Sequence, residues 1–229
     1  MKQLQTTIQT IQKRILDAGD PKAIPFMAKY GITPEQTYGV KIPKLRAIAK
    51  DYPKNHELAL ALWKINNRET RILASMIDDP KQLTEEQMDA WAMEFDYWEI
   101  CDQACMNLFE KHSLAWQKAV EWSNHANEGK KRAAFVLMAR LAVSDKKAPD
   151  QKFQPFFPLI TRESTDERNL VKKAVNWALR QIGKRNKALN QQAIQVAETI
   201  VSMKSKSAHW IATDALRELN SEAVQKRLK

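Results

Sequence analysis

The sequence predicts an all-α protein, a right-handed superhelical solenoid of about 12–14 helices packed in antiparallel pairs. Apolar residues recur at three- and four-residue spacing, beginning with Leu4, Ile8, Ile11 and Ile15, which is typical of helices with one buried face. Only five glycines and nine prolines interrupt the 229 residues, too few for the many turns of a β-sandwich or barrel. In addition, three helical segments resemble one another.

Turn residues divide the chain into segments of about 8–18 residues, each a normal length for one helix. Taken in order from the N-terminus, the breaks are expected at Gly19–Pro21, Gly31–Pro43, Pro53–Asn55, Asn66–Arg68, Asp78–Pro80, Asn124–Gly129, Ser144–Pro149, Arg162–Asp166, Gly183–Asn186 and Met203–Ser207. No change in composition marks a domain boundary, so residues 1–229 are expected to form a single repeat domain.

The similar segments are KKRAAFVLMARLAV from residue 130, NLVKKAVNWALRQIGK from 169 and SAHWIATDALREL from 207. Their starts lie 39 and 38 residues apart, close to the period of HEAT and armadillo repeats, roughly 40–47 residues. The segment ETRILASMIDD from residue 69 has the same pattern. Each segment becomes rich in alanine after a polar or basic start, as expected of inner helices that line a concave wall.

A net charge of +10 favours a polyanionic partner, either nucleic acid or an acidic membrane surface, over a neutral one. The alternative is a lysine-rich surface without such a partner. Basic residues gather near the starts of the repeated segments, where helix dipoles also favour phosphate: Lys130, Lys131, Arg132, Lys172, Lys173, Lys204 and Lys206. A concave basic face that follows a DNA backbone is therefore expected.

Two cysteines, Cys101 and Cys105, are too few for a disulfide framework and indicate a reducing, cytoplasmic location. No stretch has the length and hydrophobicity of a signal peptide or membrane span, so no membrane partner is expected. Cys101, Cys105 and His112 could contribute ligands to a zinc site. Such a site needs four ligands, usually from two separate elements, and no second cluster of Cys or His residues completes it. No glycine-rich phosphate loop is present either. We expect buried thiols, no metal and no cofactor.

The segment DYWEICDQACMNLF from residue 96 places Trp98 and Asp102 four residues apart, on one helix face. The two side chains could point together into a groove. A core tryptophan beside a solvated or capping aspartate would give the same spacing. The spacing by itself leaves both interpretations open.

Several motifs together resemble the AlkD-like DNA alkylation repair glycosylases: YWEICD from residue 97, KRAAF from 131 and KKAVNWALR from 172. The stretches FMAKY from 26 and GVKIPKLR from 39 fit the amino-terminal pattern of that family. The resemblance extends from about residue 20 to 220 and implies a HEAT-like solenoid. It further implies a monomer that binds alkylated double-stranded DNA in its concave face.

The resemblance also implies roles for individual residues. Asp102, Trp98 and Trp177 are expected to form the catalytic site, and Arg132, Tyr30, Lys131, Lys172 and Lys173 are expected to bind DNA. The implied reaction is excision of cationic N3- or N7-alkylpurines without base flipping. Glu99 is expected to be a solvated helix carboxylate. Two alternatives remain, a non-catalytic module that binds nucleic acid and a protein-interaction solenoid with an acidic partner.

Overall fold

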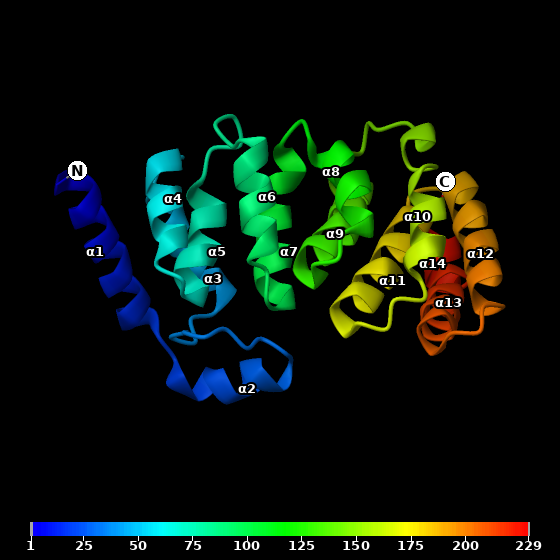
Figure 1. The fold of residues 1–229 in the computed structure, drawn as a ribbon, viewed down its shortest axis with the longest axis horizontal. Helices are drawn as coiled ribbons and strands as arrows, with labels where there is room; N and C mark the ends of the chain where they lie inside the picture. The colour runs from blue at the N-terminus through cyan, green and yellow to red at the C-terminus, as the bar shows by residue number, and fades with distance from the viewer. Residues whose placement is uncertain (1, 229) are drawn as a thin grey trace. The chain divides into compact units, whose positions relative to one another are not determined.

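The computed structural model describes residues 2–228, which form α-helices and short 3-10 helices with no β-strand among them (Figure 1). The prediction of an all-α protein is confirmed, and 14 α-helices are found within residues 2–228. The chain divides into two compact units. Unit 1 comprises the residues up to Trp91 together with Phe95–His112, and unit 2 comprises Ala92–Glu94 and the residues from Ser113 onward.

The helices of unit 1 are α1 (Lys2–Ala18), η1 (Pro21–Ala23), α2 (Ile24–Lys29), α3 (Ile42–Lys50), α4 (His56–Lys64), α5 (Arg68–Ile77), α6 (Glu85–Met93), whose last residues belong to unit 2, α7 (Trp98–Asn107) and η2 (Phe109–Lys111). Helices α4 and α5 form an antiparallel pair joined by a short turn, and α5 packs between α3 and α7. Trp63 and Trp91 stack in the core with ring centroids 3.8 Å apart, an arrangement that buries two large apolar surfaces.

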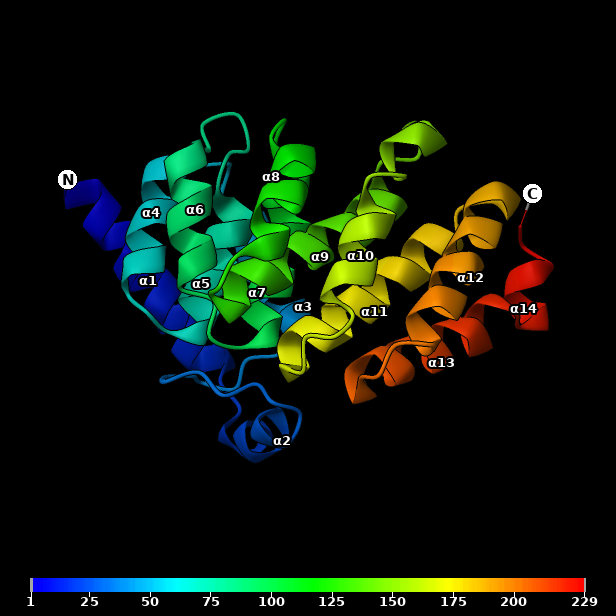
Figure 2. The ribbon, with the colours of Figure 1, turned by 45° about the vertical axis from the view of Figure 1, so that its right-hand side comes forward.

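The helices of unit 2 are α8 (Ala115–Glu121), η3 (Trp122–Asn124), α9 (Glu128–Ser144), η4 (Asp150–Lys152), α10 (Phe156–Glu163), α11 (Asn169–Gly183), α12 (Lys187–Val201), α13 (Lys206–Leu219) and α14 (Glu222–Gln225). The three similar segments of the sequence are α9, α11 and α13. They follow one another in a single layer, with α11 in contact with both neighbours (Figures 1 and 2). Helices α8, α10 and α12 pack as their partners.

Polar residues in the predicted breaks start many of the helices. The side-chain oxygen of each of these residues accepts a hydrogen bond from the backbone N–H three residues later, which satisfies one of the free donors at a helix start: Asn55, Asn67, Asn127, Asn186 and Ser205. Five of the ten breaks predicted from the sequence therefore have a local cause in a side-chain cap.

Besides the break at residues 220–221, where Ser221 caps α14, two further breaks, at residues 94–97 and 108–114, were not predicted. The sequence has no glycine or proline between Pro80 and Gly129, so neither break carries a conventional turn signal. Both are instead flanked by buried apolar residues, Phe95 and Tyr97 at the first and Leu108 and Phe109 at the second. Tertiary burial, rather than local propensity, ends α6 and α7.

Within residues 2–228, no helix has the length and apolar character required to cross a bilayer.

Candidate functional site

Helix α7 presents one partly exposed stripe. Trp98, Asp102 and Met106 follow one another at four-residue spacing and are all half-buried, as expected for residues on one face of a helix. The cysteines Cys101 and Cys105 lie on the other side, where both are buried and neither forms a disulfide. Asp102 is therefore neither sealed in the core nor fully exposed. The prediction of buried cysteines is confirmed.

Trp98 is held in place by the main chain of Tyr30. Its indole Nε1–H donates a hydrogen bond of 2.9 Å to the Tyr30 carbonyl oxygen. The next residue, Gly31, has a φ of +77°, and a Cβ at Gly31 would lie 3.8 Å from the indole Cδ1. The Tyr30 side chain itself is 71% exposed. The structure thus brings together two residues that the sequence assigned to the site, through a backbone contact that spacing could not predict.

Glu99 does not behave as predicted. We expected a solvated carboxylate, but Glu99 is only 5% exposed, and both its oxygens accept hydrogen bonds from Arg68, at 2.6 Å from Nε and 2.8 Å from Nη2. Paired charged hydrogen bonds of this kind fix geometry strongly. Burial opposes the charge of Arg68, but the hydrogen bonds and attraction from Glu99 outweigh it and raise the Arg68 pKa. The pair ties the first turn of α7 to the first turn of α5.

Glu69, which is fully buried, extends this cluster to the loop before α3. Its carboxylate accepts hydrogen bonds from the Thr37 hydroxyl at 2.8 Å and from the backbone N–H groups of Tyr38 and Val40 at 3.1 and 3.2 Å. Arg68 Nη1 donates to Glu69 at 2.9 Å. The Arg68 guanidinium therefore compensates two buried carboxylates. The Glu69 carboxylate also fixes the loop before α3, whose backbone N–H groups have no helical hydrogen bonds.

Unit 2 contains Lys131 and Arg132, and both are buried, with 8% and 5% exposure. Lys131 Nζ lies 2.5 Å from a Glu163 carboxylate oxygen and 3.3 Å from one of Asp166. Arg132 Nη1 donates to the Leu170 carbonyl at 2.8 Å, near the start of α11. The ammonium of Lys131 is thus engaged by two internal carboxylates, a geometry that weighs against its predicted role as a phosphate contact.

The remaining predicted residues of unit 2 lie on α11. Lys173 is exposed and Trp177 is half-buried. Lys172 is half-buried, and its Nζ lies over the Trp210 ring, 5.3 Å from the ring centroid. The structure therefore places the expected residues in two sets, Tyr30, Trp98 and Asp102 in unit 1 and the others in unit 2.

A basic hollow in unit 1 escaped the sequence reasoning. Its volume is about 360 Å³ and its lining residues are Arg46, Ala49, Lys50, Tyr52, Lys54, Met76, Asn107 and Lys111. Main-chain carbonyls position two of the ammonium groups, since Lys54 donates to Met76 at 2.6 Å and Lys111 to Asn107 at 2.5 Å. Partial burial and the charge of Lys111 lower the pKa of Lys54. The four cations come from three separate segments, so no sequence motif revealed them.

In the part of the chain from residue 2 to 228, His, Cys, Asp and Glu side chains form no group of three or more that could hold a metal ion.

Comparison with known proteins gives three results. The family model described as DNA alkylation repair enzyme matches residues 11–219. Two curated relatives, both uncharacterized proteins, come from Listeria innocua serovar 6a and Listeria monocytogenes serovar 1/2a. Each is 27% identical over 124 residues, which is 52% of this chain and 52% of the relative. The chain thus spans about half the length of the curated relatives it matches.

Among solved structures, one similar chain is described as a new family of proteins related to the HEAT-like repeat DNA glycosylases with affinity for branched DNA structures. It superposes with a TM-score of 0.75 at 20% sequence identity, covering 92% of this chain and 94% of that one. At this identity the similarity concerns the fold, and it confirms the HEAT-like helical repeats predicted from the period of the sequence.

Proposed function

Because the chain belongs to the family of DNA alkylation repair enzymes, we propose that it is a DNA glycosylase that excises cationic N3- and N7-alkylpurines from duplex DNA. The observation that carries this proposal is the partly exposed stripe of α7, where Asp102 lies one turn from an indole anchored on the Tyr30 carbonyl. A carboxylate and an aromatic face so placed suit a substrate that becomes cationic during reaction.

Asp102 supplies the central electrostatic contribution. Alkylation at N3 or N7 makes the purine cationic, so the base leaves as a neutral molecule and needs no general acid. Positive charge then develops on the deoxyribose, and a carboxylate about 4 Å away stabilises it by about 4 kcal/mol at an effective dielectric constant near 20. This corresponds to roughly a thousandfold in rate. The same carboxylate orients or deprotonates the attacking water.

Trp98 presents an aromatic face to the sugar, worth about 0.5–2 kcal/mol toward a cation, and Trp177 offers a further aromatic face on α11. The hydrogen bond between Trp98 and the Tyr30 carbonyl keeps that ring from rotating, which reduces the entropy lost on binding. The exposed Tyr30 side chain contacts the DNA nearby. The enzyme acts on the backbone and leaves the damaged base stacked, so that bulky lesions are accepted.

Arg132, Lys172 and Lys173 contact phosphates, the arginine through the planar fork that suits paired hydrogen bonds. Lys131 is left out of this set because Glu163 and Asp166 already engage it. The exposed lysines and arginine of the basic hollow in unit 1 supply phosphate contacts in its place. Such contacts fix the position of the protein on DNA without reading sequence.

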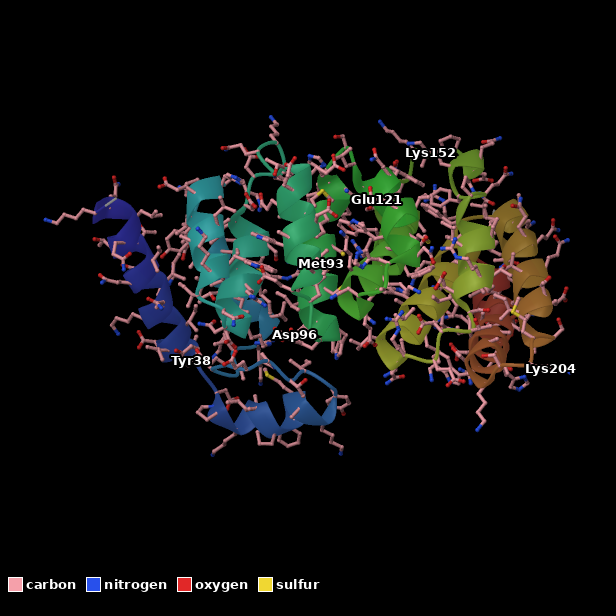
Figure 3. The ribbon with its side chains drawn as sticks, in the orientation of Figure 1. Tyr38, Met93, Asp96, Glu121, Lys152 and Lys204 are labelled. Atoms are coloured by element: carbon pink, nitrogen blue, oxygen red, sulfur yellow. The ribbon has the colours of Figure 1, made fainter. Side chains whose placement is uncertain are left out.

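Base release tests the proposal directly. Wild type, Asp102→Asn and the matched control Asp96→Asn would be incubated with methylated duplex, and released 7-methylguanine and 3-methyladenine would be quantified. Asp96 is exposed and lies just before α7 (Figure 3), so its replacement removes a nearby charge outside the site. We expect about a thousandfold loss for Asp102→Asn, unchanged DNA affinity, and wild-type rates for Asp96→Asn.

A non-catalytic nucleic-acid-binding module is the second candidate, favoured by the basic hollow of unit 1 and by the branched-DNA affinity described for the structurally similar protein. It predicts strong, salt-sensitive binding to duplex or branched DNA without base release. If wild type releases no base but binds tightly, this candidate replaces the glycosylase. Weak binding to every DNA would instead indicate a protein-interaction module with an acidic partner.

A further inference from the structure

Trp210 is a large aromatic residue on the surface of unit 2. It lies on α13 and is 42% exposed, unlike most tryptophans, which are largely buried. The Lys172 ammonium from α11 lies 5.3 Å from its ring centroid, a cation–π distance. The contact orients the indole while leaving much of the ring open to solvent. An exposed, oriented aromatic face is suited to stacking.

The register of unit 2 places Trp210 at a position that is basic in the neighbouring helices. Arg132 is the fifth residue of α9, Lys173 the fifth of α11 and Trp210 the fifth of α13. These helices follow one another in one layer, and equivalent positions of stacked repeats line up. Trp210 therefore occupies the place in α13 that two proposed phosphate contacts occupy in α9 and α11.

A surface cavity of about 510 Å³ opens beside Trp210, within the size range of small-ligand sites. Its lining residues are Lys204, Ser205, Lys206, His209, Trp210 and Thr213. No carboxylate is among these residues. The nearby Asp214 faces Arg180 and Arg217 instead. Two lysines with an aromatic face form a surface that is complementary to a nucleotide, because the base offers a π-face and the phosphate a negative charge.

We propose that Trp210 stacks on an unpaired nucleobase of a DNA strand, while Lys204 and Lys206 contact the phosphates that flank this base. The proposal rests on the proposed DNA-binding function and adds to it a subsite for single-stranded or frayed DNA. An acidic peptide would satisfy the lysines but would not use the aromatic face. A duplex contacted only through its backbone would not use that face either.

Binding of fluorescently labelled DNA would test this subsite. Wild type, Trp210→Ala and Trp210→Phe would be titrated with a blunt duplex and with the same duplex carrying a single-stranded thymidine overhang. Alanine substitution at a stacking aromatic weakens binding by about 5- to 150-fold per base. We expect a loss of this size for Trp210→Ala on the overhang DNA, a much smaller loss on the blunt duplex, and near-wild-type affinity for Trp210→Phe.

Lysine variants supply the matched control. Lys152 also lies over a tryptophan ring, 4.6 Å from the Trp116 centroid, but near the upper edge of unit 2 in Figure 3, whereas Lys204 lies near the lower edge. We expect Lys204→Ala to weaken binding and reduce its salt dependence by about one phosphate contact. Lys152→Ala should leave both quantities unchanged.

The subsite would be overturned by wild-type affinity of Trp210→Ala for overhang DNA, or by equal losses on overhang and blunt DNA. Equal losses for the alanine and phenylalanine variants would overturn it too, since a phenylalanine ring still stacks. The proposed glycosylase has a separate readout, because base release from methylated blunt duplex by wild type does not involve the overhang. Either proposal can therefore fail while the other stands.

Discussion

Replacing Glu99 with glutamine would test whether the buried Arg68–Glu99 pair stabilises the first turn of α7. The pair is linked at 2.6 and 2.8 Å, and the two side chains are only 1% and 7% exposed. Glutamine keeps one acceptor oxygen but turns an amide donor toward the guanidinium, so one charged hydrogen bond is lost. Such a bond contributes about 1.5–3 kcal/mol. Because Glu69 still compensates Arg68 at 2.9 Å, we expect a loss of about 2–3 kcal/mol.

Replacing Arg68 with methionine is expected to cost more than the Glu99 change. It leaves Glu69 and Glu99 buried without their shared cation, and removal of one partner from a buried pair costs about 3–5 kcal/mol. The stability loss is larger for Arg68→Met than for Glu99→Gln because one guanidinium compensates two carboxylates. A solvated Glu99, as predicted from the sequence, would produce almost no change for Glu99→Gln, whereas Arg68→Met would still leave the buried Glu69 without its cation.

Urea unfolding followed by tryptophan fluorescence would measure the free energies, and hydrogen exchange over residues 98–107 would locate the effect. We expect faster exchange in the first turn of α7 for Glu99→Gln. Glu57→Gln, an exposed glutamate in the first turn of α4, is the matched control and should change stability by less than about 0.5 kcal/mol. The reasoning is refuted if Glu99→Gln is as stable as this control.

Two further predictions concern stability. Burial alone would raise the pKa of Asp166, but hydrogen bonds from Arg168 and Lys131 lower this pKa below the ordinary value of 3.8. The ionised carboxylate therefore stabilises the fold above pH 3.8, and this stabilisation is lost as the pH falls further. Asp166→Asn should therefore lower the free energy of unfolding at pH 7 and flatten its decline toward about pH 3; an equally steep decline would contradict this. Gly39 and Gly31 both have positive φ, but a Cβ at Gly39 would lie 2.2 Å from the Asp20 carbonyl oxygen, whereas at Gly31 the nearest atom is 3.8 Å away. Calorimetry should show a loss of about 1–2 kcal/mol for Gly31→Ala and a larger loss for Gly39→Ala, and equal losses would refute the steric argument.

The helical repeats and most helix starts follow from local sequence. Asn67 and Asn127 cap the helices that begin directly after them, because a short polar side chain can accept a backbone hydrogen bond only within a few residues. The breaks at residues 94–97 and 108–114 have no such signal. They depend on the burial of Phe95 and Phe109, whose partners come from other helices.

In the candidate site, the sequence alone determined that Trp98 and Asp102 share a helix face, since helical periodicity is a local property. It could not determine which charges are solvated. Glu99 pairs with Arg68, 31 residues away, and Lys131 with Glu163, 32 residues away, so both lie buried where spacing suggested exposure. Local periodicity orients a side chain, but only the packing of distant helices decides whether that side chain meets water or an opposite charge.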